Sequence, residues 1–268
     1  PSAWKARLQQ RETSQLLTRL APALLARPDA ILGAVDLYAE GTEQEGGLWQ
    51  LTALQGQLAG MSLKGGDLSV VPGTPLQING RLQVASASLD LWKENLVPLE
   101  LARLLTGSLD VTADRLTLLA APMTDATAHL TLEPGGKITL SPFNGHWREG
   151  TLAITGEAQL GTSTALKGTV DLRAATVALR SGPRFGLSGL LDLNLDVTTS
   201  GQNRREWLAN LEGSGDFSLD SGDFNGLDFA ALTESLQSEP TKANLPVLLN
   251  RSGKSTLSAF GGDFSIEN

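Results

Sequence analysis

Apolar and polar residues alternate with a period of two along most of the chain after Pro28. In one such segment Leu76, Ile78, Leu82 and Val84 share a face, and the odd-numbered residues between them are polar. The same alternation recurs over residues 126–132, 152–160, 166–172 and 191–197. Because successive side chains of a strand point to opposite faces, each segment is predicted to be a strand with one apolar and one polar face. Such strands are typical of antiparallel sheets, so we expect a mostly β protein with a long antiparallel sheet.

Clusters of glycine, proline and short polar residues separate the alternating segments and predict tight turns. They occupy residues 65–67, 72–73, 134–136, 144–145 and 221–223. The segments follow no fixed repeat period, so the sequence indicates a meander rather than a strict solenoid.

Helical spacing is confined to the start of the chain and to a few short segments. Over residues 2–26, Trp4, Leu8, Leu16 and Leu20 recur at roughly helical spacing, which predicts a helix interrupted near Pro22. We therefore divide the chain into an N-terminal helical segment, residues 1–30, and a β region, residues 31–268. Short helices are also predicted over residues 96–105, 203–211, 229–237 (with Asp228 as N-cap) and 243–250.

The short helices carry too little apolar surface to cover the apolar faces of about a dozen strands, and each such face has to be buried against something. A closed sandwich or barrel would bury it against another sheet. An open, curved sheet would instead leave an apolar trough for a ligand. The apolar positions are mostly Leu, Val, Ile and Ala, which suits acyl chains and also suits an ordinary β core. The residues alone favour the ordinary core and leave the trough open as an alternative.

Composition narrows the function classes. Against 21 Lys and Arg the chain has 29 Asp and Glu, and its net charge of −8 argues against a nucleic-acid partner. Zero cysteines exclude disulfides and thiol chemistry, and the presence of just two histidines argues against a His-based metal site. The longest uncharged run, residues 46–63, contains four glycines and several polar residues, so it is not a membrane span. The sequence begins at Pro1 and stops at Asn268 within a predicted strand. We interpret it as part of a longer chain, and these residues leave open whether that chain carries an anchor or signal.

No motif for catalysis is complete. Residues 253–255 (Gly-Lys-Ser) resemble the end of a phosphate loop, but Leu248 stands where its first glycine is needed. Residues 186–190 lack the second glycine of a nucleophile elbow, and the acidic residues between 216 and 228 do not match a calcium loop. Asp192, Asn194 and Asp196 are interpreted as a solvated strand face, and His129 as a surface residue. We expect no catalytic residues, no metal site and no cofactor.

One succession of motifs goes beyond fold class. It comprises residues 47–56 (GLWQLTALQG), 98–105, 107–118, 130–140, 189–197, 211–228 and 253–266, with a helix around Trp207 and Leu208. From about residue 31 to its end, the chain resembles the AsmA family of bacterial envelope proteins. The order of the motifs carries the resemblance, since each motif alone is common.

The resemblance implies a long β-sheet folded into a groove with an apolar inner wall. It also implies a periplasmic location, with the parent protein anchored in the bacterial inner membrane by a segment absent from this sequence. The family is associated with phospholipid movement towards the outer membrane and with outer-membrane assembly. It has no catalytic motif to transfer to this chain.

We therefore expect a non-enzymatic periplasmic protein that binds phospholipid, transfers it between the inner and outer membranes and supports outer-membrane homeostasis. Its partners would be phospholipid and membranes, with no nucleic acid. The predicted groove lining consists of the apolar strand positions Leu109, Val111, Leu116, Leu118, Leu130, Leu132, Ile138, Leu140, Leu152, Ile154, Leu191, Leu193 and Leu195.

Two other functions remain open at this stage. One is a structural or assembly scaffold for outer-membrane biogenesis, with a closed β core filled by its own side chains. The other is an enzyme or glycan-binding β domain that uses the acidic strand faces. The single tyrosine and the absence of an ordered acid–base pair count against the second.

Overall fold

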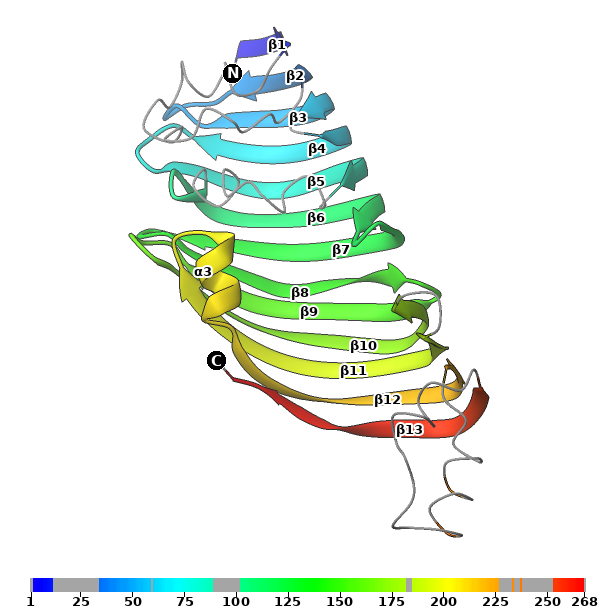
Figure 1. Cartoon of the computed structure of the whole chain (residues 1–268). Coiled ribbons are helices and arrows are strands. Elements are labelled where there is room, and N and C mark those ends of the chain that lie inside the picture. The colour runs from blue at the N-terminus through cyan, green and yellow to red at the C-terminus, as the bar shows by residue number, and fades with distance from the viewer. Residues whose placement is uncertain are drawn as a thin grey trace.

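The structure is a computed structural model that describes residues 2–11, 34–58, 60–88, 102–181, 185–226, 233, 237 and 253–267. Thirteen strands form one sheet in which the strand order follows the sequence (Figure 1). The strands are β1 Ser2–Gln10, β2 Val35–Glu43, β3 Trp49–Leu58, β4 Met61–Val71, β5 Leu76–Ser88, β6 Leu105–Leu118, β7 Ala121–Glu133, β8 Lys137–Trp147, β9 Gly150–Gln159, β10 Thr164–Ser181, β11 Phe185–Gly201, β12 Glu212–Asn225 and β13 Lys254–Ile266. The helix α3, Arg204–Ala209, joins β11 to β12. The predicted mostly β fold is confirmed.

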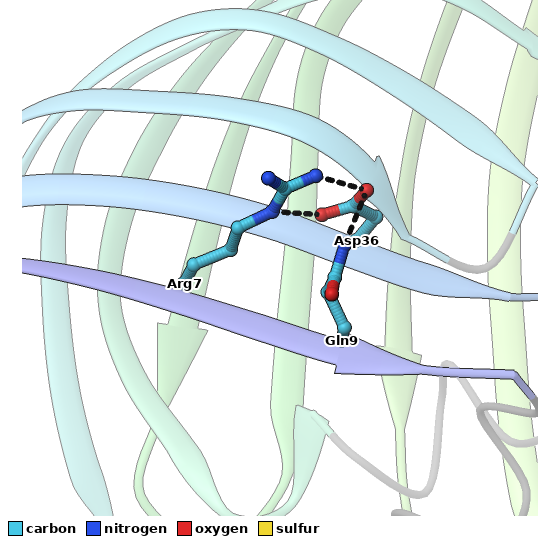
Figure 2. Close-up of polar contacts among 3 residues, drawn as sticks. All are labelled: Arg7, Gln9 and Asp36. Carbon is cyan, nitrogen blue, oxygen red and sulfur yellow. Dashed lines mark hydrogen bonds and ion pairs between the residues drawn. The ribbon is translucent and has the colours of Figure 1, made fainter.

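The sheet is curved and does not close. Its two edge strands, β1 and β13, lie at opposite ends of the stack (Figure 1). Seen from β1 and β2, strands from the middle of the sheet run behind them, which shows how strongly the sheet curls (Figure 2). The residues that the structure describes contain no second sheet. The closed sandwich or barrel core of the scaffold alternative is therefore wrong for this part of the chain.

One strand pair departs from the antiparallel meander. β5 and β6 run parallel, with Leu76 beside Leu105 and Val84 beside Ala113. All other neighbouring strands pair antiparallel. A tight hairpin cannot join a parallel pair, and residues 89–104 separate the two strands in the sequence. The helix predicted over 96–105 falls mostly outside the described residues, and Leu105 belongs to β6 rather than to a helix.

A line of irregular residues crosses the sheet from β4 to β12, and we call it the crease. It includes Lys64, Asp114, Asp125, Ala174 and Ser221, at which the strand ladders shift register or leave a residue unpaired. Three of these residues have left-handed backbone, with φ values of 53° at Asp125, 50° at Ala174 and 51° at Ser221. Such bulges bend a strand and increase its local twist. They also shift the phase of the alternation, so that the apolar residues on both sides of the crease stay on one face.

The N-terminal helix prediction is wrong for residues 2–10, which form β1. Trp4, Ala6 and Leu8 also fit a period of two, with polar or charged residues between them. Pairing with β2 decides between the two periods, because it supplies a full ladder along the segment. β1 thus belongs to the same sheet as β2. Residues 12–26 lie outside the described residues, and the domain boundary at residue 30 stays a prediction.

The glycine clusters have two different roles. Residues 72–73 and 134–136 connect consecutive strands as predicted, but residues 65–67, 144–145 and 221–223 lie inside β4, β8 and β12. Those three turn predictions are wrong because glycine also serves bulges and close packing within strands. Gly145 shows the second role: a Cβ there would lie 2.3 Å from the Met123 Cε atom.

The predicted helix over residues 203–211 is confirmed as α3. Its N-cap is Asn203, whose side chain accepts a hydrogen bond from the backbone N–H of Glu206. In the range predicted as 229–237, Thr233 and Gln237 are the described residues, and both are helical. Asp228 and the helix predicted over 243–250 lie outside the described residues.

Candidate functional site

The candidate site is one face of the sheet, which we call the apolar face. Directly paired residues of neighbouring strands point to the same side, so the ladders identify its members. Leu109 pairs with Leu130, and Leu130 with Leu140. Leu172 pairs with both Leu152 and Leu193. By this register, all thirteen residues predicted to line a groove lie on the apolar face.

The apolar face packs into one continuous cluster. Its most buried members include Met123 and Ala175, each with 0% of its surface exposed, and Val84 with 3%. Partly buried side chains extend the cluster from Leu37 on β2 to Leu193 on β11. The cluster therefore crosses ten strands without interruption. Because curling a sheet brings together the side chains of its inner side, this burial indicates that the apolar face is the inner side of the curve.

The predicted lining residues differ in burial. Leu116, Leu132 and Leu152 are buried, so they pack within the protein. The other ten are half-buried and retain some apolar surface, namely Leu109, Val111, Leu118, Leu130, Ile138, Leu140, Ile154, Leu191, Leu193 and Leu195. Contact with lipid at these thirteen positions stays a prediction.

Sequence reasoning missed several members of the same face. Met123 on β7 and Phe143 on β8 belong to the buried cluster. Neither was among the residues predicted to line the groove on those strands. Near the β13 edge, Phe217 lies edge-on to Phe260 with ring centroids 5.5 Å apart, and 6.4 Å from Phe264. The sequence holds a signal for Phe260 and Phe264 of β13. They lie four residues apart with Gly262 midway, so a strand places both on one face.

The opposite, polar face carries ion pairs between neighbouring strands. Arg7 donates from Nε and Nη2 to the two carboxylate oxygens of Asp36 at 2.9 and 2.8 Å, and Gln9 adds a third hydrogen bond (Figure 2). The hydrogen bond from Arg7 lowers the pKa of Asp36. In the same strand pair, Lys5 donates to Glu40 at 2.7 Å and lowers the pKa of that carboxyl group. These side chains are exposed or half-exposed, so their main effect is on pairing and register.

The candidate chemical groups are likewise engaged in the structure. The Asp192 carboxylate accepts the backbone N–H of the bulged residue Ala174 at 2.6 Å, and Asp196 accepts the Thr169 hydroxyl at 2.6 Å. His129 lies on the polar face with its Nδ1 atom 2.7 Å from Asp110, as predicted for a surface histidine.

The glycine–lysine–serine motif begins strand β13 instead of cradling a phosphate. Lys254 lies 3.0 Å from the carboxylate of Asp223 on the neighbouring strand. In the part of the chain that the structure describes, no group of three or more His, Asp or Glu side chains is placed to hold a metal ion.

Three solvent-open hollows lie mainly on the polar face, with volumes of about 720, 630 and 470 Å³. The first is lined by both cations and anions, among them Lys137, Lys167, Glu157 and Glu212. This mixed polar lining does not suit an acyl chain. The surface that offers apolar contact is the face on the other side of the same strands.

In the comparison with known proteins, the model of the AsmA family matches residues 76–263. No curated protein and no solved structure matches the chain. Among the described residues, no helix has the length and apolar character needed to cross a bilayer.

Proposed function

Because this chain belongs to the AsmA family of bacterial envelope proteins, we propose that it binds phospholipid and moves it between the inner and outer membranes. It does so in the periplasm, held near the inner membrane by a further part of its parent protein. The acyl chains lie on the apolar face and the head groups stay in water. This is transport without covalent chemistry, and it supports the lipid balance of the outer membrane.

The observation that carries the proposal is the continuity of the apolar face over ten strands of an unclosed sheet. Removing one CH₂ group from water is worth about 0.8 kcal/mol, so an acyl tail supplies ample driving force. Because the aliphatic side chains along the face are similar, an acyl tail can shift from strand to strand without meeting a deep free-energy minimum. The polar face, with its exposed charges, keeps the remaining surface of the sheet hydrated.

The test is lipid loading of the protein purified from bacterial envelopes. Organic extraction followed by mass spectrometry should recover phospholipid in near-stoichiometric amounts. Recovery of no phospholipid from the intact protein would overturn the proposal.

A matched pair of variants ties the lipid to the apolar face. Leu193→Asp places a charge on this face, and Asn194→Asp places the same charge one residue along, on the polar face. We expect Leu193→Asp to lower lipid loading at least fivefold with the circular dichroism spectrum retained, and Asn194→Asp to leave loading unchanged. Equal loading of both variants would contradict the assignment of the lipid to this face.

A further inference from the structure

The two sides of the crease are not equivalent. On the side of the 160–163 connection, six aliphatic side chains of the apolar face are all half-buried, and we call them the apolar strip: Leu109, Leu130, Leu140, Ile154, Val170 and Leu195. At the crease and beyond it, Leu116 is 7% exposed, and Met123 and Ala175 are 0% exposed. Leu118 and Leu191 are half-buried there, but each is directly paired with a buried alanine. The strip differs because its half-buried side chains follow one another across neighbouring strands and leave a continuous surface for a ligand.

The apolar strip is continuous across six strands. Leu109, Leu130 and Leu140 are directly paired on β6, β7 and β8. Ile154, Val170 and Leu195 are directly paired on β9, β10 and β11. The two rows adjoin at β8 and β9, where Leu140 pairs with Gly156 and Phe143 with Ile154. Within the strip no side chain carries a polar atom.

Two glycines beside the centre of the apolar strip leave that part of the apolar face without side chains. Gly156 and Gly168 pair directly, and the three atoms nearest to a Cβ placed on either are backbone atoms of the opposite strand. Ile154 and Val170 flank this bare patch on the side of the crease. Where the strip passes from β8 to β10, side chains therefore project least from the sheet. The side chains of neighbouring strands also lie farthest from one another there.

Resting on the proposed function, we infer that the phospholipid acyl chains lie across the strands in the apolar strip, and that the residues at the crease and beyond it are structural. Strands lie about 4.8 Å apart, so the strip is about 24 Å long. One acyl chain covers about half of a hydrocarbon core that is about 30 Å thick, or about 15 Å. The strip is long enough for one extended chain to lie across the strands with space to shift along them.

The test places a photo-crosslinking residue, p-benzoylphenylalanine, at single positions of the full chain in cells. Leu130 and Leu195 sample the strip. Leu118 and Leu191 are matched controls, since they are half-buried apolar-face residues beyond the crease. After irradiation and purification, we expect phospholipid adducts at 130 and 195 to exceed those at 118 and 191 at least tenfold. Comparable adducts on both sides, or adducts only at 118 and 191, would overturn the inference.

Lipid extraction from the chain without the crosslinker separates the two proposals. Phospholipid in that extract, with no adduct at 130 or 195, overturns the strip and leaves the proposed function standing. An extract without phospholipid overturns the proposed function itself. Thermal unfolding of each substituted chain establishes that the fold is retained, and Leu109 serves as a replacement position in the strip if one substitution prevents folding.

Discussion

The two faces of this sheet share every backbone hydrogen bond and differ only in their side chains. The apolar face joins residues from ten strands into one cluster. The polar face holds separate pairs such as Arg7–Asp36 and Lys5–Glu40, each confined to two neighbouring strands and exposed to water. Burial of apolar surface adds up over the whole cluster, whereas exposed ion pairs contribute little each and are screened by salt. The comparison indicates that stability and the proposed lipid path lie on one face, and strand register and hydration on the other.

The largest expected difference follows from placing the same charge on each face. Leu172 is 4% exposed beside the crease, and Leu190 is 43% exposed on the polar face. An unpaired buried charge costs about 3–5 kcal/mol, so Leu172→Lys should unfold the sheet or nearly do so. Leu190→Lys should stay within about 0.5 kcal/mol of the unchanged protein. Urea unfolding followed by circular dichroism measures both, and similar losses in the two variants would show that the faces are not distinct.

Period two predicted most strands of the β region but not β1, and the crease shows a second place where it falls short. Leu109 and Val111 are odd-numbered, Leu116 and Leu118 even-numbered, and strict alternation would put the two pairs on opposite faces. The structure brings both pairs to one face because Asp114 and the opposing Asp125 drop out of the ladder together. The apolar pattern changes phase at this point, so the sequence holds a signal for the bulge. Its position in a line across the sheet depends on strand pairing, which the pattern does not specify.

Two further differences from the sequence predictions also arise from pairing. The segment of β1 fits a helical and a strand period equally well, and the partner strand β2 decides between them. The parallel pairing of β5 and β6 depends on a crossover outside the strands, so nothing in the alternating residues distinguishes it from a hairpin. For the site, the ladders place the predicted apolar positions on one face, and their contact with lipid stays a prediction. The sequence could not separate buried Leu152 from half-buried Ile154, because both follow the same alternation and only three-dimensional packing distinguishes them.

A smaller effect is expected from overpacking the crease. A side chain at Gly145 would collide with Met123, which is fully buried and has no space to move into. Gly145→Val should therefore lower the free energy of unfolding by about 1–3 kcal/mol. Asn144→Val is the matched control, since it adds a β-branched side chain at the neighbouring, exposed position of the polar face. The midpoint of urea unfolding should fall for the first variant and hold for the second, and a loss shared by both would point to β8 itself instead of the packing of one face.

The smallest expected effect concerns the polar face alone. Hydrogen bonds from Arg7 and Lys5 lower the pKa of Asp36 and of Glu40, so these pairs stabilise β1 above the ordinary carboxyl pKa of about 4. That contribution is lost as pH falls through the lowered values, and β1 should loosen below about pH 4.

Trp4 reports on this step because it packs over Gly41 of β2. Its emission, isolated by subtracting a Trp4→Phe variant, should shift to longer wavelength between pH 5 and pH 3. Asp36→Asn should show part of this shift already at pH 7 and a weaker dependence on pH. An unchanged pH dependence in Asp36→Asn would mean that β1 is held by Trp4 and Leu8 on the apolar face, and the division of roles between the two faces would then not extend to the sheet edge.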